Sequence, residues 1–212
     1  MSVTCLCLVR HGETGWNIEK RIQGQIDIAL NANGVKQAEA AGRWLAKADM
    51  EALYSSDLGR AWQTAEAIGR ATGLPPQAEA ALRERRYGVF EGLTHDEAKL
   101  KDPAGHAALV ARDPDYALGN GESLKMLLAR VSGVMQRLVE RHPGGRIIAV
   151  THGGVIDIVN RLIRGNPLET PRDFLIPNTG FNWLVCRDGA WAIEVWGDTS
   201  HLAPGVLDEL PS

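Results

Sequence analysis

The sequence predicts an α/β protein, a three-layer α/β/α sandwich whose central sheet is mostly parallel. Short apolar runs of the buried-strand type, such as Val3–Val9 and Arg146–Thr151, alternate with longer segments of helical periodicity. The 212 residues contain no repeat, no low-complexity tract and no linker long enough to divide the chain. We therefore expect a single domain that spans residues 1–212.

Four segments are predicted to be helices, and two of them, Leu30–Lys47 and Gly121–Arg141, have apolar residues at the spacing of an amphipathic helix. Asn31 is a candidate cap for the first, and Gly73 and Gly144–Gly145 are typical ends for the second and third. In chain order, the helices are expected at Leu30–Lys47, from Ser56 or Asp57 toward Thr72, at Gly121–Arg141, and from Gly153–Gly154 to about Arg164. The intervening segment Ala81–Ala117 is the least regular part and holds a short helix over Thr94–Lys101.

The strands are predicted from short runs rich in apolar residues. Cys5 and Cys7 alternate within the first of them, so both point to one face and are expected to be small buried hydrophobes. Arg187-Asp188-Gly189 is a turn between two later runs, which predicts a hairpin. The expected strands are Val3–Val9, Met50–Tyr54, Arg146–Thr151, Asn182–Cys186 and Trp191–Trp196.

Composition excludes several classes of function. A formal net charge of -3 and a pI near 6.1 argue against a general nucleic-acid or anionic-membrane binder. No apolar run approaches the roughly 20 residues of a membrane span, and the first residues lack a basic leader. Cys5, Cys7 and Cys186 show no CxxC spacing, so we expect neither a disulfide framework nor a cysteine metal site. The chain is expected to be cytoplasmic, without nucleic-acid or membrane partners.

Two of the predicted strands end abruptly in a His-Gly pair, in LVRHGETGWN (Leu8–Asn17) and AVTHGG (Ala149–Gly154). Ligands of open α/β sheets bind just beyond the carboxyl ends of the strands, so His11 and His152 are expected to meet across one pocket. Arg10 places a fixed cation beside the first histidine, which indicates an anionic substrate. This pattern favours phosphate chemistry on a histidine.

Phosphoryl transfer depends on positioning and on stabilising the charge of the phosphoryl oxygens. A neutral imidazole is a competent nucleophile near pH 7, and a backbone carbonyl in the turn after His11 is a plausible holder for its second nitrogen. Glu84 is the best candidate to supply a proton to the leaving oxygen. The candidate donors to the phosphoryl oxygens are Arg10, Asn17, Arg60, His152 and the backbone N–H of Gly153.

Five blocks, in this order, resemble the histidine phosphatase superfamily, which contains the cofactor-dependent phosphoglycerate mutases and many phosphatases. The blocks are RHGETGWN (Arg10–Asn17), RIQGQID (Arg21–Asp27), SSDLGRAWQTA (Ser55–Ala65), LRERRYGVFEG (Leu82–Gly92) and THGG (Thr151–Gly154). The resemblance covers the chain from about Val3 to His201. It implies the phosphoglycerate mutase-like fold, with an additional helical segment between the two halves of the motif set.

The resemblance also implies roles for individual residues. His11 would be the nucleophile that becomes phosphohistidine, and Glu84 the general acid and base. The mechanism would need no metal and no nucleotide cofactor. The positions that match the family's phosphate pocket are Arg10, Asn17, Arg60 and His152, with Gln23 and Gly24 in the loop that helps line it. Gly153 follows the second histidine, and Arg85, Arg86 and Tyr87 are assigned only to the substrate rim.

Within this family, the sequence favours a phosphomonoesterase acting on small phosphorylated metabolites. The mutases carry, after the acid, an insert whose lysine and paired arginines hold the substrate carboxylate. Here His95 stands where that pattern continues to a lysine, and the shorter segment offers only Lys99, Lys101 and Arg112. The alternative is a phosphoglycerate mutase that interconverts 2- and 3-phosphoglycerate, primed by 2,3-bisphosphoglycerate.

Two interpretations from other classes stay open at this point. One is a catalytically silent protein that binds a phosphorylated ligand, against which the intact His11, Arg60, Glu84 and His152 argue. The other is a metal hydrolase, for which the sequence offers no HExxH motif or Asp-rich cluster. The tryptophan-rich C-terminal hairpin is a candidate edge for a homodimer. The remaining histidines, expected at surface or packing positions, are His95, His106, His142 and His201.

Overall fold

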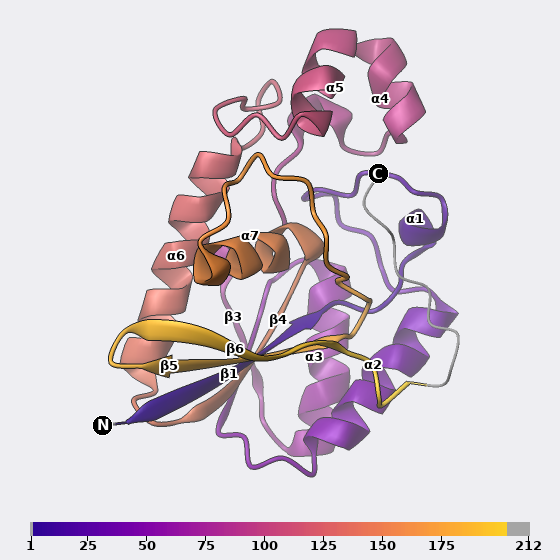
Figure 1. The fold of residues 1–212 in the computed structure, drawn as a ribbon. Helices are drawn as coiled ribbons and strands as arrows, with labels where there is room; N and C mark the ends of the chain where they lie inside the picture. Colours follow the sequence, from indigo (N-terminus) through magenta and orange to yellow (C-terminus); the bar gives the residue numbers. More distant parts are fainter. Residues whose placement is uncertain (1, 203–212) are drawn as a thin grey trace.

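The computed structural model describes residues 2–202 and confirms the mostly parallel α/β/α architecture expected from the sequence (Figure 1). The strands are β1 (Val3–Arg10), β2 (Ala52–Ser55), β3 (Pro76–Ala78), β4 (Arg146–Thr151), β5 (Phe181–Arg187) and β6 (Ala190–Asp198). The helices are α1 (Gly15–Ile18), α2 (Ala32–Leu45), α3 (Gly59–Thr72), α4 (His95–Lys101), α5 (Pro103–Val110), α6 (Leu124–Arg141) and α7 (Gly153–Arg164). Short 3-10 helices lie at Ala80–Leu82 and Gly88–Phe90.

The six strands form one sheet in the order β3-β2-β4-β1-β5-β6. The first four strands of this order run parallel, and the C-terminal hairpin β5–β6 continues the sheet in antiparallel pairing. The central pair is β1 and β4, in a register that sets Arg10 opposite Thr151. These two strands, distant in sequence, therefore end side by side, as the paired His-Gly motifs predict.

Helices cover both faces of the sheet because successive strand residues point to opposite sides. On one face, α2 and α3 pack against a buried cluster that includes Cys7, Val9 and Val150. On the other, α6 and α7 pack against a larger cluster that includes Leu6 and Ile147. Figure 1 shows α2 and α3 together on one side of the strands, and α6 and α7 on the other.

The predicted cap of α3 is wrong. The helix begins at Gly59, with Leu58 as a cap residue that makes no side-chain capping bond. The capping oxygen comes instead from a distant loop, where Asp27 Oδ1 accepts the Gly59 N–H at 2.6 Å. Asp57 is occupied elsewhere, since its carboxylate pairs with Arg83. A cap supplied across 32 positions has no signature in the local sequence.

Other elements differ from the expectation in smaller ways. The helix α6 begins three residues later than expected because Ser123 caps it by accepting the Met126 N–H. The short strand β3 and the helix α5 lie in segments where no such element is predicted, although α5 has a cap and a proline at its start, Asp102 and Pro103. Cys7 is buried as expected, but Cys5 is partly exposed because it lies near the beginning of β1.

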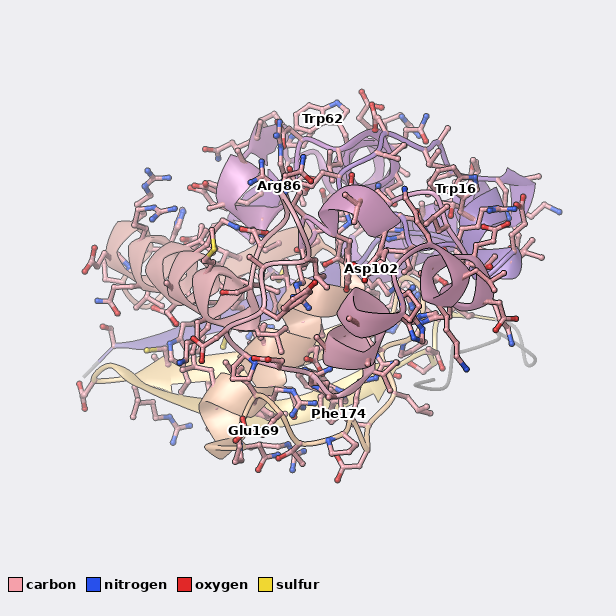
Figure 2. All side chains as sticks on the ribbon, turned by 90° about the horizontal axis from the view of Figure 1, so that it is seen from above. Trp16, Trp62, Arg86, Asp102, Glu169 and Phe174 are labelled. Atoms are coloured by element: carbon pink, nitrogen blue, oxygen red, sulfur yellow. The ribbon has the colours of Figure 1, made fainter. Side chains whose placement is uncertain are left out.

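The segment between the two halves of the sheet forms a small helical layer of its own. The helices α4 and α5 lie at the top of Figure 1, above α7, and pack on a separate cluster around Phe90, Ala98 and Leu118. From above, this layer, marked by Asp102, lies near the centre of the view, between Trp62 and Phe174 (Figure 2). None of the helices in the described part of the chain has the length and apolar character needed to cross a membrane.

Candidate active site

The ends of β1 and β4 bring the two predicted histidines together. The backbone N–H of His11 donates to Thr151 O at 2.9 Å, so the residue after β1 is still held to the end of β4. The imidazole ring centroids of His11 and His152 are 5.1 Å apart, and both side chains are buried. Two residues separated by most of the chain thus lie side by side at the same edge of the sheet, as predicted from the strand ends.

The ring of His11 is held in one orientation by its own turn. Its Nδ1 lies 2.7 Å from Gly12 O, and a carbonyl oxygen can only accept, so Nδ1 carries the proton. Nε2 is therefore the nitrogen with a lone pair, and it lies 3.3 Å from Arg60 Nε. Burial, followed by the charges of Arg60 and Arg10, holds the pKa of His11 well below its ordinary value. The site contains a neutral imidazole whose unprotonated Nε2 is the nucleophilic nitrogen and accepts a hydrogen bond from Arg60 Nε.

His152 is fully buried beside it and is also held neutral, since burial and the charge of Arg60 lower its pKa well below the ordinary value. Its Nε2 lies 2.8 Å from Ser56 Oγ. Its Nδ1 has no hydrogen-bond partner among the described residues. The sequence marks Ser56 only as a candidate helix cap, so its contact with the second histidine is a site feature that sequence reasoning missed.

Arg60 lies on the first turn of α3 and is completely buried, which is unusual for an arginine. Besides the contact with His11, its guanidinium donates to Gly24 O at 2.7 Å and Ile26 O at 3.0 Å. Burial lowers the pKa of Arg60 to about 10, so it remains a cation at neutral pH. Arg10 is buried as well and donates to Ile176 O at 2.7 Å. Two cations thus border the nucleophilic nitrogen.

The loop around Gln23 and Gly24 is tied to the two histidines through Arg60, which donates to Gly24 O and to His11 Nε2. Gly24 has a left-handed backbone (φ 53°), and a Cβ there would overlap the Glu91 carboxylate. Asn17 is buried in α1, where its Oδ1 accepts the N–H and the hydroxyl of Thr14, each at 3.0 Å. This commits the carbonyl end of the Asn17 amide to the helix cap and fixes its orientation.

Glu84 lies between the two 3-10 helices, and its carboxyl group reaches the first residues of α7, next to the second His-Gly motif. It is 9% exposed; its Oε1 accepts the Arg85 N–H at 2.7 Å and its Oε2 accepts the Gly154 N–H at 3.0 Å. A Cβ built on Gly153 would lie 3.8 Å from Arg10 Nε and 4.0 Å from Glu84 Oε2. The carboxyl group and the guanidinium therefore flank the same short stretch of backbone, where an anion would meet both.

The three expected rim residues have different surroundings. Arg85 is buried rather than on a rim, and its guanidinium donates to Glu122 O at 2.9 Å and Tyr116 O at 3.3 Å. Tyr87 is partly buried beneath it, and burial raises the pKa of its phenol to about 12. Arg86 is exposed and is labelled in Figure 2.

A further residue, Asn178, holds the backbone of His11 from the loop after α7. Asn178 Nδ2 donates to His11 O at 2.8 Å, and the Thr179 N–H donates to Arg10 O at 3.0 Å. Both backbone carbonyls of the Arg10-His11 pair are therefore held by this loop. No motif in the sequence marks these residues, because their role depends only on the tertiary approach of the loop to β1.

The other histidines lie in separate contacts, as expected for packing positions. His95 Nδ1 faces His106 Nε2 at 3.4 Å in the α4–α5 layer, and His142 lies between Tyr54 and Glu51. His201 stacks on Phe181. Among the described residues, no group of three or more His, Cys, Asp or Glu side chains is arranged to hold a metal ion.

Gly154 gives a direct test of how Glu84 is positioned. A Cβ at Gly154 would overlap Glu84 Oε1, so Gly154→Ala should displace the carboxyl group. Displacements of about 1 Å in a catalytic constellation cost on the order of 100-fold in rate, and we expect a loss of about that size in kcat/KM for alkyl phosphates. Gly133→Ala, where the added Cβ meets only the flexible Arg137 side chain at 3.4 Å, is the matched comparison and should retain far more activity. Equal losses in the two variants would contradict this account.

The two buried histidines also predict how stability depends on pH. The folded protein holds His11 and His152 neutral, whereas the unfolded chain binds protons there below about pH 6.5. The unfolded state then binds more protons, so the free energy of unfolding should decrease from pH 7 to pH 5. The slope approaches about 1.4 kcal/mol per pH unit for each histidine. His201, whose pKa burial lowers to about 4, contributes in the same direction.

Urea denaturation at several pH values measures this dependence. His11→Asn should give a shallower slope than the unsubstituted protein, because one of the proton-binding differences is removed. A free energy of unfolding that stays constant between pH 7 and pH 5 would show that the buried imidazoles do not control it.

Comparison with known proteins agrees with this geometry. Residues 6–199 match the histidine phosphatase superfamily (branch 1). Over 201 residues the chain is 40% identical to a phosphoglycerate mutase-like protein of Arabidopsis thaliana, covering 93% of this chain and 86% of that protein. It is 39% identical to a metal-independent phosphoserine phosphatase of the same plant, covering 95% of this chain and 84% of the relative.

Among solved structures, a mycobacterial glucosyl-3-phosphoglycerate phosphatase superposes with a TM-score of 0.81 at 30% identity, covering 92% of this chain and 99% of that one. The sequence match and the structural match both extend over nearly the whole chain. The paired strand-end histidines and the buried arginines lie within the matched residues. The chain belongs to the histidine phosphatase superfamily, branch 1.

Proposed function

We propose that this protein is a phosphomonoesterase that hydrolyses small phosphorylated metabolites through a phosphohistidine on His11, with Glu84 as general acid and base. The observation that carries the proposal is the state of His11: its Nδ1 proton is held by Gly12 O, and its Nε2 lone pair lies 3.3 Å from Arg60 Nε. A neutral nucleophile bordered by fixed cations suits attack on a phosphate monoester.

In the first step, the lone pair of His11 Nε2 attacks phosphorus and the bond from phosphorus to the leaving oxygen breaks. Glu84 gives its proton to that oxygen, which leaves as an alcohol. Arg10, Arg60 and the Gly153 N–H supply donors to the phosphoryl oxygens. Asn17 and His152 complete the pocket in this proposal.

In the second step, Glu84 takes a proton from water as the water oxygen attacks phosphorus. The nitrogen–phosphorus bond breaks, its electron pair returns to Nε2, and inorganic phosphate leaves. Glu84 is then protonated again and the cycle closes. Each step uses groups of the chain itself and needs no cofactor. A relative named as metal-independent supports this part of the proposal.

The contacts of Arg112 favour hydrolysis over the mutase alternative. A mutase must hold the substrate carboxylate so that the bisphosphorylated intermediate is retained. Arg112 Nη2 donates to Asp157 Oδ2 at 2.6 Å, and its Nε donates to Leu168 O at 2.8 Å, so the guanidinium is engaged within the protein. Lys101 Nζ donates to Val89 O at 2.9 Å. Two of the three basic side chains available in this segment are therefore committed to the fold.

The deciding experiment is an incubation with 3-phosphoglycerate and catalytic 2,3-bisphosphoglycerate in the presence of a chelator, following inorganic phosphate and 2-phosphoglycerate together. Release of phosphate without isomerisation is the expected result. Rapid formation of 2-phosphoglycerate with little phosphate would establish the mutase instead. A panel with phosphoserine and glucosyl-3-phosphoglycerate then defines the substrate, since relatives carry those names.

A further inference from the structure

The segment that carries Glu84 has an unusually complete set of side-chain supports. Residues 81–84 are not part of the sheet, yet each of their four carbonyl oxygens accepts a hydrogen bond from a side chain. Thr151 Oγ1 donates to Leu82 O at 2.7 Å, and Gln25 Nε2 donates to Glu84 O at 2.9 Å. Arg130 donates to the carbonyl oxygens of residues 81, 83 and 84. Since α6 supplies Arg130, one helix fixes most of this segment.

Arg130 uses all of its donors in this arrangement. An arginine has five N–H groups. Nη1 donates to Ala81 O at 2.9 Å and Arg83 O at 2.8 Å, and Nη2 donates to Glu84 O at 3.3 Å. The remaining two N–H groups bind the Glu122 carboxylate, from Nε at 2.9 Å and from Nη2 at 2.7 Å. A point-like lysine ammonium could not satisfy this planar set of acceptors.

Glu122 holds the other side of Glu84. Its Oε2 accepts the Arg86 N–H at 3.0 Å, its own N–H donates to Arg86 O at 2.7 Å, and its carbonyl accepts from Arg85 Nε at 2.9 Å. Burial raises the pKa of Glu122, but the hydrogen bonds from Arg130 and from the Arg86 N–H outweigh it and keep the pKa below its ordinary value. The carboxylate is therefore charged at neutral pH. Together, Arg130 and Glu122 bind the backbone on both sides of Glu84.

We propose that Arg130 and Glu122 are positioning residues. They hold the backbone of Glu84 so that its carboxyl group lies within hydrogen-bond reach of the leaving oxygen of the substrate. The proposal rests on the proposed function, because it assigns these residues to the proton transfer step. A general acid must lie within hydrogen-bond reach of the leaving oxygen, so a small shift of the Glu84 backbone removes its catalytic effect. Neither residue needs to touch the substrate, since each acts through the backbone that carries the acid.

The dependence of kcat/KM on the leaving group separates positioning from a merely structural role. A mispositioned acid slows alkyl phosphates, whose leaving oxygen needs a proton, much more than p-nitrophenyl phosphate, whose leaving group needs little help. We expect Arg130→Lys to lower the ratio of alkyl to aryl kcat/KM by about tenfold. Arg141→Lys is the matched control, because Arg141 is exposed in the last turn of the same helix. It should leave the ratio unchanged.

A second variant guards against a failure of Arg130→Lys to fold. Glu122→Gln keeps the shape of the side chain, but its amide NH2 faces one of the N–H groups from which the carboxylate now accepts a hydrogen bond. This bond is lost, so the variant should also lower the ratio of alkyl to aryl kcat/KM. In a Glu84→Gln background, Arg130→Lys should add no further loss of selectivity, because the group that it positions is absent. Melting temperatures of all variants show that the comparison is made on folded protein.

The outcomes separate this proposal from the proposed function. Equal losses for alkyl and aryl phosphates in Arg130→Lys and Glu122→Gln, while Glu84→Gln alone is selective, overturn the positioning role and leave the function standing. A Glu84→Gln variant with no selectivity overturns the acid assignment and the positioning role with it. A selective loss in all three variants, absent from Arg141→Lys, supports both.

Discussion

Replacement of His11 by alanine is expected to lower kcat by at least about 10⁴-fold, the scale of losses seen when a covalent nucleophile is removed. The reason is that Nε2 of His11 is a neutral nitrogen with a lone pair and faces the cation of Arg60 at 3.3 Å. Without it, the remaining donors can bind phosphate but have no atom to transfer it to. The alanine variant keeps the backbone N–H that binds Thr151 O, so the fold should be retained.

Two measurements check this prediction. Steady-state phosphate release gives the loss in kcat, and rapid quenching with labelled substrate shows whether an acid-labile, alkali-stable phosphoenzyme forms in the unsubstituted protein and is absent from His11→Ala. His106→Ala is the control, since His106 is in the α4–α5 layer with His95 as its ring partner. Turnover by His11→Ala close to that of the control would remove His11 from the nucleophile role.

Much of the fold could be predicted because its signals are local. The apolar runs of β1 and β4 and the His-Gly pair that ends each of them identify two buried parallel strands and the edge at which they deliver side chains. The cap of α2 is also local, since Asn31 accepts the Gly34 N–H within the same turn. Contacts that close over long sequence separations left no such signal, as the capping of α3 by Asp27 shows.

The residues of the candidate site also fall into two groups, those that a local sequence motif marks and those that only the tertiary fold brings into place. His11, Arg60 and His152 lie in short motifs next to element ends, so their convergence follows from topology. Asn178, by contrast, comes from an irregular loop and reaches His11 O only through the tertiary fold. Arg85 is predicted in the wrong place rather than missed. The sequence predicts this charged neighbour of Glu84 at the substrate rim, whereas its side chain is buried and donates to backbone carbonyl oxygens. Sequence therefore predicts which candidate groups converge at the site better than which groups hold them in place.

Replacement of Glu84 by glutamine is expected to lower kcat/KM for alkyl phosphates by about 10² to 10⁴-fold, the usual contribution of a general acid, and to affect p-nitrophenyl phosphate far less. Both oxygens of Glu84 accept backbone N–H groups, from Arg85 and Gly154. A glutamine side chain has one accepting oxygen, so the variant loses one of these bonds as well as the proton. The selectivity of the loss reports proton transfer from position 84, because glutamine has no acidic proton to give and p-nitrophenolate leaves with little need of one.

Glu91→Gln is the matched control for this change. Glu91 Oε1 alone accepts two backbone N–H groups, from Gln25 at 3.0 Å and Tyr87 at 2.9 Å, so glutamine can keep both bonds with its single carbonyl oxygen. Its effect on alkyl and aryl phosphates should be equal. Because the proposed mechanism also uses Glu84 to deprotonate water in the second step, Glu84→Gln should release a burst of p-nitrophenol and then accumulate phosphohistidine. Equal loss on both substrate classes, without a burst, would mean that Glu84 shapes the pocket and another group carries the proton.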